Sequence, residues 1–224
     1  GWQDIPNFSK KACKDNLNKS KKFLNDMVKI QSLKKIIISG SCFEYLNKRG
    51  EVKEKDKLDR KNFFSNSKIK LEEFTRKICL NNNKTFYWLR FFYVYGPNQR
   101  SASLIPYIVK SIVNNSELIL NNPKMTLDFI NVVDVSKIIK LFIKKKIPSG
   151  IYNVGSGKKI SVIEIYNYLL FEILKKKKNK YKIEKNNFFI SNNKKLIKNI
   201  GRFNFTSIKK GLTNYLLWFR NIKK

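Results

Sequence analysis

A run of three isoleucines within LKKIIISGS, residues 33–41, constrains the fold of this chain more than any other feature. An apolar stretch that ends in small residues is typical of a strand buried on both faces, and such strands occur in parallel sheets. A second stretch of this kind, TFYWLRFFYVY at 85–95, ends at Gly96 and Pro97. Two buried strands separated by helical sequence predict an α/β fold with a parallel sheet.

Helical and extended segments alternate along the rest of the chain. Apolar residues recur at helical spacing over 12–31, and a further helix is expected after Ser65 and Asn66, which are suitable N-cap residues. The other expected elements are helices at 102–115, 134–145, 161–174 and 207–219, a short strand at 127–131, a strand and turn at 151–157, a polar loop at 51–62 and a lysine-rich linker at 175–180.

The composition excludes several classes of protein. The 224 residues suffice for one core with a small appended lobe, and no apolar run approaches the roughly 20 residues that cross a bilayer. Cysteines 13, 42 and 79 form no CxxC pair and indicate free thiols in a reducing compartment, so we expect a cytoplasmic protein. The chain has no histidine, which excludes a Ser-His-Asp triad and His-ligated metal sites; no metal is expected.

The formal net charge of +32 raises the question of a nucleic-acid partner. The lysines are spread along the whole chain, and arginine, the better reader of bases, is scarce. We therefore interpret the charge as a solvated lysine coat, expect no specific nucleic acid, and keep a charge-driven nucleic-acid binder only as a third alternative.

Six segments, in their shared order and spacing over nearly the whole chain, resemble the extended short-chain dehydrogenases, the NAD-dependent epimerase/dehydratase group that modifies nucleotide sugars. The segments are GSCFEY (40–45), FSNSK (64–68), LRFFYVYGPNQ (89–99), LDFINVVDV (127–135), YNVGSGKKISVIEI (152–165) and IGRFNFTSIKKGLTNYLLWF (200–219). The resemblance implies a Rossmann-type doubly wound parallel sheet with a small C-terminal α+β substrate lobe.

The resemblance also implies a division of the chain. Residues 1–96, with 127–157 returning to them, match the second half of an NAD(P)-binding Rossmann domain with the catalytic segment, and 97–126 and 158–224 match the substrate-binding lobe. GWQDIPN, residues 1–7, resembles the loop after the family's fourth strand, and the sequence holds no glycine-rich dinucleotide turn. We therefore expect an N-terminally truncated member with an incomplete sheet, the first βαβ units being absent.

By the same resemblance, Ser41, Lys68 and the residue at position 64 are the catalytic group. In the family a Ser or Thr orients the substrate oxygen, a Tyr transfers a proton, and a Lys lowers the pKa of the Tyr and binds the nicotinamide ribose. Here Phe64 stands at the Tyr position and cannot carry a proton. The loss of one general acid–base group typically lowers the rate of the catalysed reaction by a factor of roughly 10² to 10⁴. The protein is a weak or inactive relative, another hydroxyl such as Tyr45 or Tyr93 substitutes, or the sequence is imperfect. We favour reduced activity, because a replacement phenol must also reach Lys68.

The resemblance implies binding of NAD or NADP and of a nucleotide sugar. The expected cofactor-binding residues are Gly1, Asn16, Ser39, Lys68, Phe91 and Phe92. The expected substrate-binding residues are Ser41, Tyr93, Ser103, Leu104 and Leu127. Leu127 stands where the family has a phosphate-binding Arg, and Tyr93 stands where the family often has an Asn.

The expected function is an NAD(P)-dependent nucleotide-sugar epimerase or 4-ketosugar reductase, which transfers a hydride at a sugar carbon. Cys42 and Phe43 follow Ser41 where sugar dehydratases of the family carry an acidic pair, which disfavours a dehydratase. The alternative is an impaired member that binds a nucleotide sugar or a partner without chemistry. The family commonly dimerises through two helices, here near 10–31 and 65–81, so a homodimer is expected and a membrane partner is not.

Overall fold

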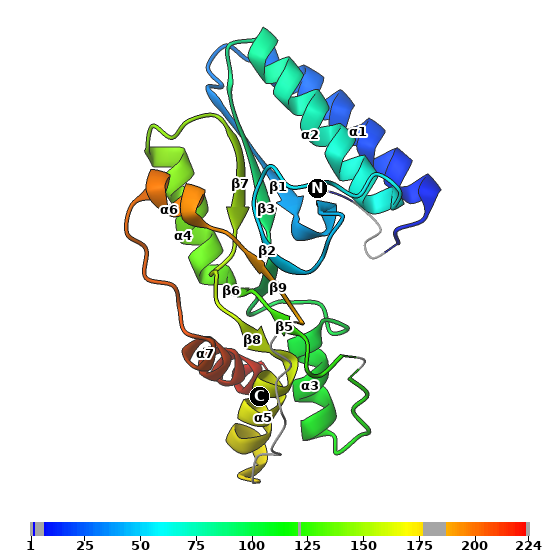
Figure 1. The fold of residues 1–224 in the computed structure, drawn as a ribbon, viewed down its shortest axis with the longest axis vertical. Helices are drawn as coiled ribbons and strands as arrows, with labels where there is room; N and C mark the ends of the chain where they lie inside the picture. Colours follow the sequence, from blue (N-terminus) through cyan, green and yellow to red (C-terminus); the bar gives the residue numbers. More distant parts are fainter. Residues whose placement is uncertain (1, 3–6, 121, 177–186, 223–224) are drawn as a thin grey trace.

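The computed structural model describes residues 2, 7–120, 122–176 and 187–222 (Figure 1). Gly1, an expected cofactor-binding residue, and most of the 175–180 linker lie outside the described residues. The helices are α1 (Lys10–Val28), α2 (Phe63–Asn81), α3 (Leu104–Val113), α4 (Val132–Lys144), α5 (Val162–Leu174), α6 (Lys194–Ile200) and α7 (Ile208–Asn221), with a 3₁₀ turn at Cys42–Glu44. The strands are β1 (Lys35–Ser41), β2 (Gly50–Val52), β3 (Thr85–Phe91), β4 (Tyr93–Tyr95), β5 (Thr126–Leu127), β6 (Phe129–Asn131), β7 (Gly150–Val154), β8 (Ile160–Ser161) and β9 (Phe188–Ser191).

A parallel sheet in the order β1-β3-β7 forms the centre of the first half of the fold. The pair α1 and α2 lies on one face of this sheet, and α4 and α6 lie on the other (Figure 1). Successive side chains of β3 therefore enter different cores, with Phe86 and Trp88 packed toward α1 and α2 and Tyr87 and Leu89 packed toward α4 and α6. The predicted α/β fold of Rossmann type is confirmed.

A second, four-stranded sheet in the order β2-β9-β5-β8 continues into the lobe that holds α3, α5 and α7 (Figure 1). The apolar core of this lobe joins side chains from all three helices with aromatic residues of the strands, such as Phe129 and Phe189, and with Phe92 between β3 and β4. Helix α6 belongs in space with β7 and α4, because Leu196 and Ile200 are buried in the same core as Tyr152 and Phe142.

Two stretches that the sequence predicts as single strands are each split. After Phe91 the chain leaves its pairing with β7: Phe92 N still donates to Val154 O at 3.1 Å, and Tyr93 N donates to Asp128 O at 3.1 Å. Residues 93–95 then pair with β6 instead. The stretch 127–131 breaks at Asp128, whose side chain is fully buried. Both breaks mark the passage from the first sheet to the lobe.

The start of α2 differs from the sequence prediction. Its N-cap is Asn62, whose Oδ1 accepts a hydrogen bond from Ser65 N at 3.1 Å. The prediction of Ser65 or Asn66 as N-cap is wrong, because the helix begins at Phe63. Ser65 instead donates its hydroxyl to Phe43 O at 2.6 Å, which ties the first turn of α2 to the 3₁₀ turn after β1.

Several lysines serve the ends of helices rather than a binding face. Lys35 Nζ donates to the carbonyl oxygens of Phe142, Ile143 and Lys145 at 3.0, 2.7 and 2.8 Å, at the carboxyl end of α4. Lys145 Nζ donates to Ile200 O at 2.6 Å, at the end of α6. A cation placed there satisfies carbonyl groups that the helix leaves unpaired and complements the helix dipole. Part of the large positive charge is therefore structural.

Nowhere in the part of the chain that the structure describes is a helix both long and apolar enough to cross a membrane.

Candidate active site

Lys68, in the second turn of α2, contacts the carboxyl end of β1, the strand that Ser41 terminates. Ser41 is the last residue of β1, and its Oγ accepts a hydrogen bond from Phe43 N at 3.2 Å. Lys68 lies on the face of α2 that covers β1, and its Nζ donates to Ser39 O at 3.0 Å. The Lys68 side chain is 8% exposed. Burial lowers the pKa of Lys68 to about 8, although the nearby Glu44 carboxylate opposes that fall.

Phe64 precedes Lys68 by four residues and so lies on the same side of α2. Its ring meets Trp2 edge to face, with 5.4 Å between centroids, and lies 4.6 Å from the ring of Phe8. Lys68 Nζ lies 4.5 Å from the centre of the Trp2 ring. Trp2 therefore contacts both residues of the expected Tyr-x-x-x-Lys pair, a contact that the sequence reasoning did not anticipate.

A cavity of about 470 Å³ opens beside Lys68. It is lined by Trp2, by Lys19, Ser20, Phe23 and Leu24 of α1, by Ile37, Ile38 and Ser39 of β1, and by Lys68 and Leu71 of α2. Within the described residues β1 is an edge strand, which explains why Ser39 is exposed although it lies inside a strand. The cavity joins an apolar wall to a cation and a hydroxyl, and it includes Ser39 and Lys68 of the expected cofactor-binding set.

The other expected cofactor residues lie outside the lining of this cavity. Asn16 is buried on α1 and donates its side-chain amide to Ala12 O at 3.0 Å. Phe91 ends β3 opposite Ser41. Phe92 is 2% exposed and packs against Tyr45 and Phe189 in the core of the lobe. A cofactor role for these three residues stays a prediction.

Apart from Ser41 at the end of β1, the expected substrate residues lie at the lobe. Tyr93, Leu104 and Leu127 pack into its apolar core, and Ser103 is the N-cap of α3 without a side-chain cap bond. The rings of Tyr93 and Phe43 lie 6.1 Å apart, which joins this group to the turn after Ser41. Leu127 is buried, and its aliphatic side chain carries no charge for a phosphate group.

Neither tyrosine considered as a replacement for the missing phenol lines the cavity beside Lys68. Tyr45 is fully buried, donates its hydroxyl to Asn153 Oδ1 at 2.6 Å and accepts a hydrogen bond from Arg90 Nη1 at 3.2 Å. Burial raises the pKa of Tyr45 to about 12. Burial also raises the pKa of Tyr93, whose ring is packed against Phe129 and Phe189. Both changes work against proton transfer near neutral pH.

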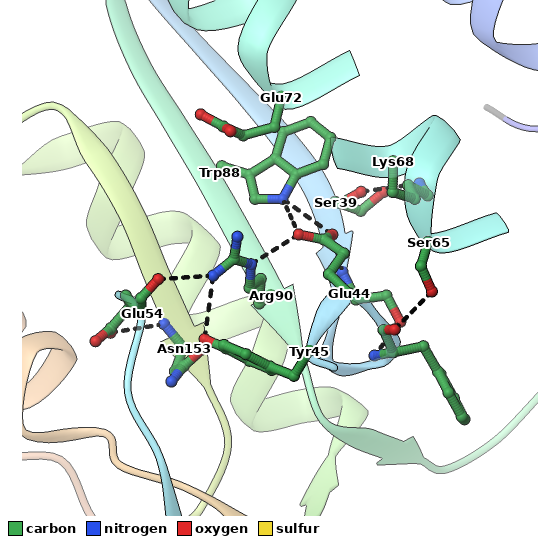
Figure 2. A network of polar contacts seen from close by, with 12 residues as sticks. Ser39, Glu44, Tyr45, Glu54, Ser65, Lys68, Glu72, Trp88, Arg90 and Asn153 are labelled. Carbon is green, nitrogen blue, oxygen red and sulfur yellow. Dashed lines mark hydrogen bonds and ion pairs between the residues drawn. The ribbon is translucent and has the colours of Figure 1, made fainter. Parts of the chain in front are cut away.

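A buried polar network centres on Glu44 and Arg90 (Figure 2), and Ser41 N donates a hydrogen bond to Glu44 Oε1 at 2.7 Å. Arg90 Nε donates to Glu44 Oε2 at 2.7 Å, and Arg90 Nη1 donates to Tyr45 Oη and to Glu54 O. Trp88 Nε1 donates to both oxygens of Glu44 at 3.1 Å. Of these residues, sequence reasoning named Tyr45, as a possible replacement phenol, and missed Glu44, Trp88 and Arg90. The available signals were an arginine inside the apolar stretch 85–95 and a glutamate within GSCFEY.

A second buried carboxylate, Asp128, joins the first sheet to the lobe. Its oxygens accept hydrogen bonds from the backbone N–H groups of Ser156, Gly157 and Ser191 and from the hydroxyls of both serines. Gly155 is required beside it, because a Cβ there would overlap the Asp128 carboxylate and the Ser191 hydroxyl. Gly155 thus serves close packing, which the sequence did not predict, and Gly157, at φ +70°, lies in the turn expected within 151–157.

Comparisons with known proteins add an independent line of observation. Residues 9–155 match the profile of the family described as "NAD dependent epimerase/dehydratase family". CDP-abequose synthase of Salmonella muenchen is 32% identical over 119 residues, which are 52% of this chain and 36% of that protein. The chain therefore matches only about a third of the length of that curated relative.

Solved structures share the fold. TunA, described as an NAD dependent NDP-hexosamine 5,6-dehydratase involved in tunicamycin biosynthesis, has a TM-score of 0.80 at 20% identity, covering 99% of this chain and 75% of that one. MoeE5 in complex with UDP-glucuronic acid and NAD has a TM-score of 0.78 at 19% identity, with coverages of 91% and 70%. A tyrosine-to-phenylalanine variant of UDP-glucuronic acid 4-epimerase from Bacillus cereus, in complex with UDP-4-deoxy-4-fluoro-glucuronic acid and NAD, has a TM-score of 0.78 at 21% identity, with coverages of 91% and 66%.

Proposed function

The chain belongs to the NAD dependent epimerase/dehydratase family, and on that premise we propose that its site binds NAD and a nucleotide sugar and transfers a hydride at a sugar carbon, as an epimerase or 4-ketosugar reductase. The observation that carries the proposal is the approach of Lys68, on α2, to the carboxyl end of β1, where Ser41 lies. In open α/β sheets, ligands bind outside the carboxyl ends of the strands.

The cavity beside Lys68 fits the cofactor side of this proposal. Lys68 and Ser39 offer a cation and a hydroxyl against an apolar wall, a set that suits a ribose beside a flat heteroaromatic ring. The nicotinamide, when bound, supplies the hydride acceptor and donor. MoeE5 and the Bacillus cereus epimerase are described with NAD, which supports NAD over NADP as the cofactor.

Ser41 and Lys68 are both prepared to donate hydrogen bonds. The Ser41 oxygen already accepts a hydrogen bond from Phe43 N, so its own proton is directed away from that contact and can reach a sugar oxygen. An ammonium carries three N–H groups, and Ser39 O takes one of those of Lys68. We propose that Ser41 orients the substrate oxygen and that Lys68 holds cofactor hydroxyls.

Proton transfer is the step that this chain performs poorly. Phe64 has no acidic proton, and the structure gives neither Tyr45 nor Tyr93 access to the cavity beside Lys68. We therefore propose that binding is retained and that turnover is lower by roughly 10² to 10⁴ than with a phenol at position 64. The complex of the Tyr-to-Phe epimerase variant shows that such a replacement is compatible with ligand binding in that protein, which supports the same expectation here.

The test is a hydride-transfer assay on the chain and its Phe64→Tyr variant. Each protein is mixed with NAD and with UDP- or CDP-linked hexoses, either unlabelled or deuterated at C4. Hydride removal is followed as reduced nicotinamide at 340 nm and by its slowing with deuterium, and hydride return to the opposite face is followed as formation of the C4 epimer. We expect Phe64→Tyr to raise the rate, and Phe64→Leu, the matched control without a hydroxyl, to leave it low. Equal rates in all three proteins, with ligands bound, would reject the role of position 64.

A second function follows if both ligands bind and no hydride moves even with tyrosine at position 64. The protein would then be a nucleotide-sugar-binding member of the family without chemistry. Titration calorimetry with the same sugars separates this outcome from a protein that binds neither ligand.

The quaternary structure, the division of the chain and its location are also proposals. Helices α1 and α2 lie side by side (Figure 1), and Phe23 and Leu80 on them are 61% and 77% exposed. This apolar exposure supports a homodimer through these helices. Leu104 of α3 shares one core with Ile165 of α5 and Leu212 of α7, which supports a substrate lobe built from 97–126 and 158–224, although α6 within the second range packs with α4 and β7. Cys13, Cys42 and Cys79 are free thiols, which supports a reducing compartment such as the cytoplasm.

A further inference from the structure

Glu44 is fully buried and follows Ser41, the last residue of β1, by three positions. Its Oε1 accepts a hydrogen bond from Ser41 N at 2.7 Å, and its Oε2 accepts one from Arg90 Nε at 2.7 Å. Trp88 Nε1 donates to both oxygens at 3.1 Å. The carboxylate is therefore fully hydrogen-bonded, and one of its donors is the backbone of the proposed catalytic serine.

The last three residues of β1 are held from two sides. Lys68 approaches from α2 and bonds the carbonyl of Ser39, while Glu44 bonds the amide of Ser41. Gly40 lies between these contacts, and a Cβ at that position would overlap Trp88 Nε1 and come within 2.9 Å of Glu44 Oε1. The absence of a side chain at Gly40 is what allows the indole and the carboxylate to lie against the backbone.

The charged groups around Lys68 come from several elements. Glu44 follows β1, Glu72 lies one turn further along α2, Arg90 is on β3 and Lys19 is on α1 across the cavity. Figure 2 shows Lys68 and Glu44 on the same side of the sheet end, with Arg90 beyond Glu44. Among these groups, the Glu44 carboxylate favours the ammonium form of Lys68, while burial favours the neutral form.

We infer that Glu44 is a positioning residue of this site: its carboxylate fixes the backbone that carries Ser41 and places a negative charge beside the Lys68 ammonium. The inference rests on the proposed function, and it deepens that function by adding a third side chain to the Ser41 and Lys68 pair. Arg90, itself held by Tyr45 Oη and Glu54 O, keeps the carboxylate in place.

Glu44→Gln tests both parts of the role. The carboxylate of Glu44 has two acceptor oxygens, whereas the carboxamide of Gln has one. The positive charge of Arg90 will attract that single oxygen. Ser41 N–H therefore loses its hydrogen-bond acceptor. We expect amide hydrogen exchange at Ser41 to become about tenfold faster, the factor expected for one ordinary hydrogen bond. In a titration of lysine ε-carbon shifts, with Lys68 identified by Lys68→Arg, we expect the pKa of Lys68 to fall below its wild-type value, because the carboxylate that favours the ammonium form is gone.

Two variants separate position from charge. Glu44→Asp keeps the charge but draws the carboxylate back by one methylene, so exchange at Ser41 should rise while the pKa of Lys68 stays close to its wild-type value. Glu72→Gln is the matched control, because Glu72 is also buried but is paired with Arg76. It should leave exchange at Ser41 unchanged.

The result that overturns the inference is Glu44→Gln with wild-type exchange at Ser41 and an unchanged Lys68 titration. If Glu44→Gln alone does not fold, Glu44→Leu with Arg90→Met removes both buried charges and leaves Ser41 N–H without an acceptor on residue 44; it is judged by exchange at Ser41, where a wild-type rate overturns the inference. Neither readout needs a ligand. Altered exchange and titration in a chain that binds no NADH would keep Glu44 as the residue that places Ser41 and Lys68, and would reject the proposed function instead.

Discussion

The replacement Asp128→Asn offers a quantitative test of how the two halves of the fold are joined. The Asp128 side chain is fully buried, with Oδ1 accepting hydrogen bonds from Ser156 N and Ser156 Oγ, both at 2.7 Å. Oδ2 accepts from Gly157 N at 3.0 Å, from Ser191 N at 3.1 Å and from Ser191 Oγ. The site thus offers three backbone N–H groups and two hydroxyls to one carboxylate.

An asparagine has a single acceptor oxygen for these donors. Its best orientation directs that oxygen to Gly157 and Ser191 and turns the NH₂ group toward Ser156, whose hydroxyl can rotate to accept. Ser156 N–H then faces another donor, and leaving one such group unpaired costs about 1–3 kcal/mol. The remaining hydrogen bonds also lose their charge-assisted strength. We expect the free energy of unfolding to fall by about 2–4 kcal/mol.

The assay is urea unfolding followed by tryptophan fluorescence and circular dichroism, with equal m-values as the condition for comparison. Ser156→Ala is the matched control, because it removes one hydroxyl donor and keeps all three backbone hydrogen bonds; we expect a loss of about 1 kcal/mol. If Asp128→Asn were no more destabilising than Ser156→Ala, the view of Asp128 as the joint between the sheet and the lobe would be wrong.

Three further predictions concern single residues. Burial lowers the pKa of Lys68 from 10.5 to about 8, so between these pH values the unfolded chain binds more protons than the folded chain. As pH rises from about 8 to 10.5, the free energy of unfolding of the wild type should therefore increase relative to that of Lys68→Met, by at most about 3 kcal/mol. A difference in urea unfolding that does not change with pH would contradict this. Gly211→Ala should lower the Tm despite a helix-propensity gain of about 1 kcal/mol, because a Cβ on α7 would overlap the Tyr95 hydroxyl; a raised Tm would refute the contact. Lys35→Met should destabilise the chain by about 1 kcal/mol, because three carbonyls at the end of α4 lose a donor; a loss no larger than that of Lys22→Met on the surface of α1 would count against this role.

The sequence predicted the long elements and missed the short ones, for a physical reason. The stretch 33–41 and the helix at 161–174 carry a full apolar pattern, and they appear as β1 and α5. The strands β2, β8 and β9 have two to four residues each, too few for a periodic pattern. They form because distant segments offer backbone partners, as β9 does for β2.

The candidate site was found from the order of motifs and not from local chemistry. Ser41, Phe64 and Lys68 were recognised because their segments resemble a family in sequence order, and the structure places Ser41 and Lys68 at one strand end. Glu44 and Arg90 were missed because their importance depends on burial and on a contact across 46 residues of sequence. Arg90, a charged residue inside an apolar strand, was the signal in the sequence, because a buried charge needs an oppositely charged or hydrogen-bonded partner.

The measurement that tests the central claim most directly is NADH binding to this chain and to Lys68→Met, followed by the change in nicotinamide fluorescence. The account predicts saturable binding to the wild type and affinity at least about tenfold weaker for Lys68→Met, the factor expected for loss of one ordinary hydrogen bond. Lys22→Met, on the exposed side of α1, is the control for general loss of charge and should bind as the wild type does. Equal affinity of wild type and Lys68→Met, or no saturable binding to either, would contradict the assignment of the cavity beside Lys68 as the cofactor site.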